Sequence, residues 1–122
     1  MKNKKVLVVE DELIISMEIQ DRLQDLGFMV VGAVPSSEKA IASYIEKSPD
    51  LIFMDIQLQD DIDGIETASH IRRFSDVPII FLTAYSNKES RKRAGEIPFS
   101  FYMNKPFSEY EIHNIITNVF TN

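Results

Sequence analysis

Several polar residues stand at the ends of apolar runs, and their types suggest phosphoryl chemistry. Asp55 ends the run LIFM, and the acidic pair Glu10-Asp11 follows the run VLVV. Thr83 ends a third run, and Lys105 follows a fourth. An ionised carboxylate at the end of a buried strand costs free energy unless a cation or hydrogen-bond donors pair with it. Asp55 therefore needs partners from elsewhere in the chain.

These residue types together match the requirements of a phosphoryl group bound with a metal ion. Three neighbouring carboxylates repel one another and coexist only around a cation. Ligation by oxygen alone, with room for water and phosphate oxygens, favours Mg²⁺ over Ca²⁺. The Lys105 ammonium would add a second positive charge, the Thr83 hydroxyl would hold one phosphoryl oxygen, and a carboxylate would be the nucleophile.

Apolar runs alternate with amphipathic segments along the chain. We expect strands at residues 5–10, 28–34, 51–55, 78–83 and 99–103, and helices at 12–27, 36–49, 63–74, 86–95 and 108–120. Strands that are apolar on both faces and alternate with helices predict an α/β fold with a parallel sheet covered on both sides. Since ligands bind at the carboxyl ends of such strands, chain order alone places the polar residues at one rim.

Local signals mark the helix starts and the buried helix faces. Three capping patterns are expected: Asp63 with Glu66, Ser86 with Glu89, and Ser108 with Glu111. The helix at 36–49 is expected to direct three apolar side chains inward: Ile41, Tyr44 and Ile45. The helix at 86–95 has almost no apolar face, so we expect it to be the least stable element. Its basic cluster indicates a solvated face or, alternatively, a docking patch for an acidic partner: Lys88, Arg91, Lys92 and Arg93.

Length and composition limit the possible classes of protein. The 122 residues, 44% hydrophobic and 26% charged, predict one globular domain. The chain has no cysteine, which excludes a disulfide framework and a thiolate metal site. The net charge of −6 argues against direct nucleic-acid binding by this domain. No apolar run approaches membrane-spanning length, and the run after the basic N-terminus is too short for a signal peptide, so we expect a cytoplasmic location.

Five segments together resemble the receiver domain of two-component response regulators across the whole chain: VLVVEDE, LIFMDIQ, DGIE, PIIFLTAY and YMNKPF. The resemblance implies a single receiver domain over residues 1–122, with a doubly wound, flavodoxin-like sheet of strand order 2-1-3-4-5. It implies a phosphorylation-controlled signalling switch that is not an enzyme, apart from Mg²⁺-dependent gain and loss of its own phosphoryl group. A histidine kinase would be the phosphodonor. The surface of the fourth helix, fifth strand and fifth helix would control an unidentified output partner.

The resemblance also implies roles for residues around the metal. Asp55 would be the phosphoacceptor and a metal ligand. Asp11 would bind Mg²⁺ directly, Glu10 would bind it mainly through water, and the Gln57 backbone carbonyl would be a further ligand. Glu10 stands where the family more often has Asp, and the loop after Asp55 is one residue longer than the commonest spacing.

A second set of residues would handle the phosphoryl group. The resemblance implies that Thr83 bonds it, that Lys105 pairs with it, and that Tyr102 turns inward on activation. It further implies a cis peptide bond between Lys105 and Pro106. By their positions, Gln57 and Tyr85 would flank the path of an attacking water, with Tyr85 shielding the phosphoryl group.

The sequence offers three alternatives to a stand-alone switch. The chain could be a receiver from a larger regulator or hybrid kinase. It could be an interaction module that is never phosphorylated, but the complete set of rim residues argues against this. It could be a phosphatase of the haloacid dehalogenase type, but those enzymes carry the nucleophile in an Asp-x-Asp motif on the first strand. Here the apparent nucleophile, Asp55, ends the third strand.

Overall fold

The computed structural model describes residues 3–84 and 87–121 and has alternating strands and helices. In chain order the elements are β1 (Lys5–Val9), α1 (Leu13–Asp25), β2 (Met29–Val34), α2 (Ser37–Lys47), β3 (Leu51–Asp55), α3 (Gly64–Arg72), β4 (Ile79–Thr83), α4 (Lys88–Gly95), β5 (Ser100–Asn104) and α5 (Glu109–Thr121). The strands form one parallel sheet in the order β2-β1-β3-β4-β5, which confirms the predicted topology.

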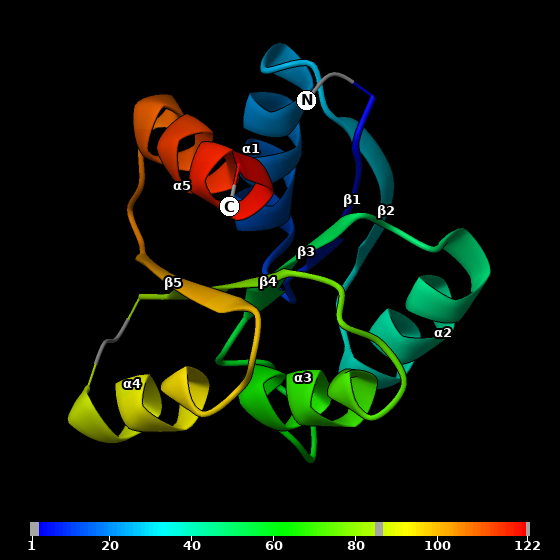
Figure 1. Ribbon diagram of the computed structural model, residues 1–122, viewed down its shortest axis with the longest axis vertical. Helices are drawn as coiled ribbons and strands as arrows, with labels where there is room; N and C mark the ends of the chain where they lie inside the picture. The colour runs from blue at the N-terminus through cyan, green and yellow to red at the C-terminus, as the bar shows by residue number, and fades with distance from the viewer. Residues whose placement is uncertain (1–2, 85–86, 122) are drawn as a thin grey trace.

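The sheet separates two hydrophobic layers. Figure 1 shows α1 and α5 on one face of the sheet and α2, α3 and α4 on the other. Successive strand residues point to opposite faces, so Val6 and Val8 of β1 pack in the layer with α1 and α5, while Leu7 and Val9 pack in the other. Burial on both faces explains why β1, β3 and β4 are continuous apolar runs. In the described part of the chain, no helix is long and apolar enough to cross a membrane.

The helix starts follow the capping signals closely. The Glu66 backbone N–H donates to Asp63 Oδ1 at 2.9 Å, and the Glu111 backbone N–H donates to Ser108 Oγ at 3.1 Å, so both predicted caps are confirmed. Ser86 lies outside the described residues. At the start of α4, Asn87 Oδ1 accepts from the Ser90 backbone N–H at 2.7 Å.

The inward face of α2 was predicted correctly except at Ile45. Ile41 and Tyr44 pack against the core beside the buried Ala40, whereas Ile45 is 66% exposed. Each helical residue advances by about 100°, so the position after Tyr44 lies past the edge of the buried stripe. In α4 the only buried residue within the described range is Ala94, as its polar sequence predicted.

Gly64 allows α3 to begin directly against the end of β3. A Cβ at this position would lie 2.0 Å from the Asp55 carbonyl oxygen and 2.9 Å from the Asp55 carbonyl carbon. The Gly64 N–H also donates to the Ile56 carbonyl at 2.9 Å. The backbone of Asp55 is therefore held in place by a contact that only glycine permits.

We expect Gly64→Ala to lower the free energy of unfolding by about 1–3 kcal/mol, because backbone atoms must move to admit the methyl group. Gly95→Ala is the matched control, since a Cβ there meets nothing within 4 Å. It should be neutral or stabilising by up to about 1 kcal/mol. Urea unfolding of both variants measures the difference, and equal stabilities would contradict the tight contact at Gly64.

Candidate functional site

Three carboxylates meet at the carboxyl ends of β1 and β3, two adjacent strands. One carboxylate oxygen from each of Glu10, Asp11 and Asp55 lies within 4.8 Å of the others. Glu10 is 3% exposed, Asp55 is 2% exposed and Asp11 is half-buried. A cluster of carboxylate oxygens is the donor set that a hard divalent cation such as Mg²⁺ prefers. The residues present therefore fit the metal that the sequence suggested.

Lys105 brings a positive charge to this cluster. Its Nζ donates to Glu10 Oε1 at 2.6 Å and lies 3.5 Å from Asp55 Oδ1. The Lys105 backbone N–H donates to the Thr83 carbonyl at 2.8 Å, which ties the end of β5 to the end of β4. The peptide bond between Lys105 and Pro106 is cis, as predicted.

Burial and neighbouring charges shift the pKa values of Glu10 and Lys105. Burial, together with the nearby Asp55, raises the pKa of Glu10 to about 7 against the opposing hydrogen bond from Lys105. Burial alone would lower the pKa of Lys105, but the hydrogen bond to Glu10 and the charge of Asp55 outweigh it and raise that pKa. A metal ion at the cluster would reduce the repulsion between the carboxylates that Lys105 alone does not neutralise.

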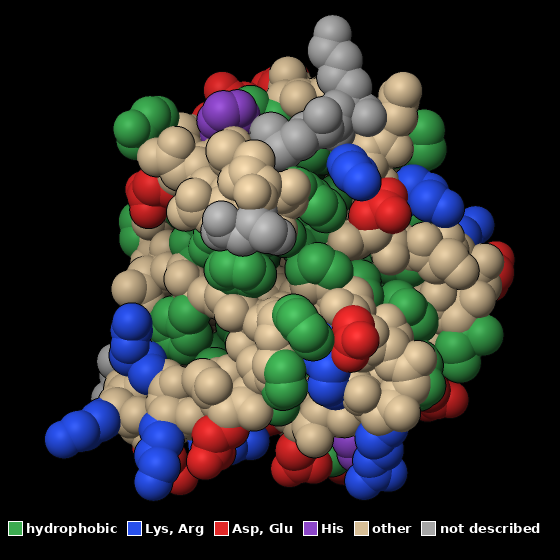
Figure 2. Space-filling model, viewed as in Figure 1, with side chains coloured by type: hydrophobic (Ala, Val, Ile, Leu, Met, Phe, Trp, Pro, Cys, Tyr) green, Lys and Arg blue, Asp and Glu red, His purple; other side chains and the backbone are tan. Residues whose placement is uncertain are grey.

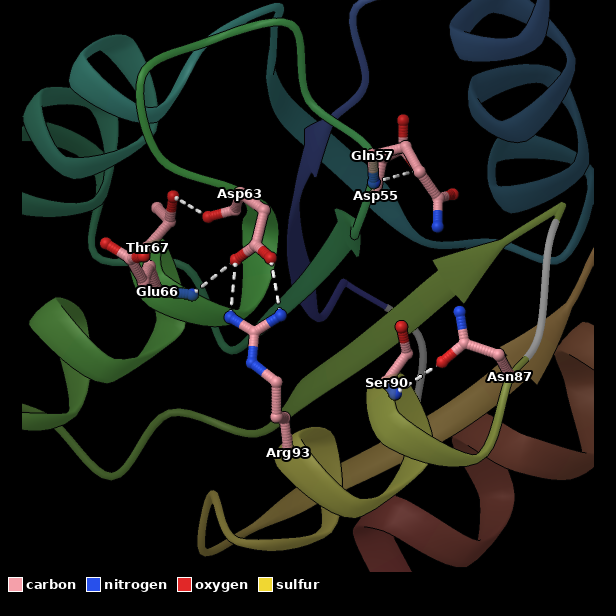
Figure 3. A network of polar contacts seen from close by, with 8 residues as sticks. All are labelled: Asp55, Gln57, Asp63, Glu66, Thr67, Asn87, Ser90 and Arg93. Carbon is pink, nitrogen blue, oxygen red and sulfur yellow. Dashed lines mark hydrogen bonds and ion pairs between the residues drawn. The ribbon is translucent and has the colours of Figure 1, made fainter.

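Thr83 lies beside the cluster and contacts the residue two positions after Asp55. The Thr83 hydroxyl donates to Gln57 Oε1 at 2.9 Å, and Thr83 is fully buried. The Gln57 backbone N–H donates to Asp55 Oδ1 at 3.2 Å (Figure 3). From the sequence, Gln57 was expected to offer its backbone carbonyl to the metal and its side chain to the path of an attacking water, and the contact with Thr83 was not predicted. Tyr85, its expected counterpart, lies outside the described residues.

The loop after Asp55 is held at several points along its length. The Gln59 backbone N–H donates to Asp11 Oδ2 at 3.1 Å. The Asp60 carboxylate accepts a hydrogen bond from the Ser37 backbone N–H, in the first turn of α2. The loop is therefore connected both to Asp11 and to the start of α2.

Tyr102 lies apart from the rim residues, in the middle of β5 beside α4. It is half-buried, and the Arg91 guanidinium carbon lies 4.6 Å from its ring centroid. A pocket of about 230 Å³ between α4 and β5 is lined in part by Arg91, Ala94 and Tyr102. The structure thus gathers the predicted phosphoryl-binding and metal-binding residues at one rim and places Tyr102 under the neighbouring helix.

Arg93 connects α4 to the loop that begins at Asp55. Its guanidinium donates to both carboxylate oxygens of Asp63, at 2.8 and 3.2 Å, and Asp63 also caps α3 (Figure 3). Figure 2 shows Lys and Arg side chains gathered over α4. From the sequence, this basic cluster was expected to be a solvated face or a docking patch. For Arg93 the structure shows instead an ion pair within the chain.

Comparisons with known proteins show which family and which folds this chain resembles. The model of the response regulator receiver domain family matches residues 6–117. The transcriptional regulatory protein PdtaR of Mycobacterium tuberculosis is 34% identical over 105 residues, which are 86% of this chain and 51% of PdtaR. The chain spans about half the length of the curated relatives it matches.

Two solved structures illustrate the similarity of fold. The signal receiver domain of a modulated diguanylate cyclase from Desulfovibrio desulfuricans has a TM-score of 0.88 and 31% identity, covering 97% of this chain and 94% of its own. The anti-anti-sigma factor PhyR from Bartonella quintana has a TM-score of 0.82 and 33% identity, covering 98% of this chain and 48% of PhyR.

We expect Arg93→Met to lower the free energy of unfolding by about 1 kcal/mol, the upper range for a partly exposed pair, and to speed amide exchange in α4 but not in α5. The methionine keeps the apolar stem and removes only the charge and its hydrogen bonds. Lys92→Met, an exposed position on the same helix, is the control and should leave both measurements near the parent values.

The effect of Arg93→Met should depend on pH. Burial alone would raise the pKa of Asp63, but the hydrogen bonds from Arg93 and the Glu66 backbone outweigh it, so this pKa lies below its usual value. A lowered pKa stabilises the fold fully above the ordinary carboxyl value of about 4, and the stabilisation is lost as pH falls through the lowered value. Urea unfolding should therefore show a constant difference from pH 7 to about 5 that shrinks below about pH 4. A difference that grows with acid would contradict the ion pair.

Proposed function

The chain belongs to the response regulator receiver domain family, and from this premise we propose that Asp55 accepts a phosphoryl group in a Mg²⁺-dependent reaction. Receiver domains of response regulators are signalling domains and act as switches. One observation carries the proposal: the buried Asp55 carboxylate lies within a cluster with Glu10 and Asp11, beside the Lys105 ammonium.

The proposed transfer moves the phosphoryl group from a histidine kinase to Asp55. A carboxylate oxygen of Asp55 attacks phosphorus, the bond from phosphorus to the donor nitrogen breaks, and the released imidazole keeps that electron pair and takes a proton from water. Lys105 then pairs with the phosphoryl oxygens, and the Thr83 hydroxyl donates to one of them. The resulting acyl phosphate is held at the end of β3.

The metal would be held by oxygen atoms of Asp55 and of residues near it, from side chains and from the backbone. Asp11 and Asp55 supply carboxylates, the Gln57 backbone carbonyl supplies a neutral oxygen, and Glu10 acts through water. When bound, Mg²⁺ neutralises charge on the carboxylates and on the phosphoryl oxygens. Glu10 also accepts a hydrogen bond from Lys105 at 2.6 Å, and the three N–H donors of the ammonium leave Lys105 able to pair with phosphoryl oxygens as well.

The proposed output surface comprises α4, β5 and α5. Thr83 ends β4 just before α4, and Tyr102 lies beneath α4 next to a pocket. A shift of Thr83 toward the phosphoryl group would allow α4 and Tyr102 to rearrange. The relatives' names indicate transcriptional regulators, a cyclase and an anti-anti-sigma factor. Because this chain spans about half the length of the curated relatives, we propose that it works as the receiver of a larger regulator whose output partner is unidentified.

Asp55→Asn should abolish phosphorylation by acetyl phosphate and Mg²⁺, because the amide removes the only proposed nucleophile. Intact mass of the parent should show one labile phosphoryl adduct, and Asp61→Asn, at an exposed acid on the same loop, should keep it. A full adduct in Asp55→Asn would disprove the assignment. No adduct in the parent would favour the interaction module, and rapid turnover of phosphomonoesters would favour the phosphatase.

Asp11→Asn should weaken Mg²⁺ binding by at least about tenfold more than Glu10→Gln. A direct charged contact is worth about 1.5–3 kcal/mol or more, whereas another water can replace a water-mediated contact. Isothermal titration calorimetry of both variants at one pH gives the comparison. Equal losses, or a larger loss in Glu10→Gln, would reverse the roles proposed for these two residues.

A further inference from the structure

The Gln57 side chain accepts the hydrogen bond of the Thr83 hydroxyl, which a phosphoryl group on Asp55 would also accept. Thr83 Oγ1 donates to Gln57 Oε1 at 2.9 Å, and the Gln57 backbone N–H donates to Asp55 Oδ1 at 3.2 Å. Gln57 therefore bridges the phosphoacceptor and the threonine at the end of the neighbouring strand. A threonine hydroxyl has one proton to donate. It cannot donate that proton to Gln57 and to a phosphoryl oxygen at the same time.

We propose that Gln57 is a positioning residue whose side chain holds Thr83 in the resting arrangement and competes with the phosphoryl group for its proton. This inference rests on the proposed function of Asp55. Activation is then an exchange of acceptors at Thr83. The new acceptor is charged and gives the stronger hydrogen bond, so the exchange is favourable, but the bond to Gln57 must be given up first.

Thr83 and Gln57 differ in burial, and this difference keeps the cost of breaking their hydrogen bond small. Thr83 is fully buried, whereas Gln57 is exposed. When the bond breaks, water can satisfy the Gln57 amide, so the loss is small on that side. The Gln57 backbone stays tied to Asp55, so the amide oxygen remains near and can recapture Thr83 when the phosphoryl group leaves. Gln57 thus stabilises the resting state without blocking the active one.

The test uses beryllium fluoride with Mg²⁺ as the phosphoryl mimic and a double-mutant cycle. Gln57→Met keeps the length of the side chain but removes the acceptor, and Thr83→Val keeps the shape but removes the donor. We expect Gln57→Met to bind the mimic about twofold to tenfold more tightly than the parent, the range for one net hydrogen bond. In the Thr83→Val background the same change should have no effect. Gln59→Met, an exposed glutamine on the same loop whose backbone N–H binds Asp11, is the control and should match the parent.

Two results would overturn the inference. One is equal or weaker binding in Gln57→Met, and the other is an effect that persists in Thr83→Val. Mg²⁺ affinity without fluoride is measured for the parent and for Gln57→Met, and the mimic is titrated at saturating Mg²⁺ in both, so that a difference in metal affinity does not enter the comparison. If the parent takes up no mimic at all, the proposed function fails as well. If the parent binds it and the variant binds equally, only the inference fails.

Discussion

The burial of Glu10 and Asp55 at the ends of two adjacent strands is the constraint on which the rim depends. Removing such charges from water is unfavourable unless a cation compensates. Lys105 is the cation that the structure provides, and it binds Glu10 more closely than Asp55. Burial and the neighbouring Asp55 raise the pKa of Glu10 against the hydrogen bond from Lys105, and the two carboxylates raise the pKa of Lys105 against its own burial. The three carboxylates of this cluster offer the oxygen donors that a hard divalent cation prefers.

The contacts around Asp55 make the proposed switch an exchange of partners. Lys105 is engaged by Glu10, and Thr83 is engaged by Gln57, before any phosphoryl group is present. Neither group has to be drawn from bulk solvent into the site. The helix α4 is likewise connected to the loop after Asp55 by a partly exposed ion pair, while it buries only Ala94 in the described range. Polar contacts of this kind break at a smaller cost than a packed core.

The sequence alone was sufficient to predict the features that depend on local signals. Strand periodicity, helix caps such as Asp63 and Ser108, and the positions of Asp55 and Lys105 all follow from short segments of chain. Contacts between side chains from different elements do not. The bonds from Thr83 to Gln57 and from Arg93 to Asp63 join residues that are 26 and 30 positions apart, and residue type alone does not select those partners. Ile45 was misplaced for a related reason, because the width of a buried helix face depends on what packs against it.

The contact at Gly64 bears on how this loop tolerates changes in length. The bond from the Gly64 N–H to the Ile56 carbonyl fixes both ends of the segment between them. With its ends fixed, the segment behaves as a closed loop, for which one additional residue raises the closure entropy cost by only about 0.1 kcal/mol. An insertion at the exposed Asp61 would therefore add little entropy cost and leave the bonds of Gln59 and Asp60 to the neighbouring elements intact. That position is accordingly a suitable place to insert a reporter peptide while Asp55 stays in position.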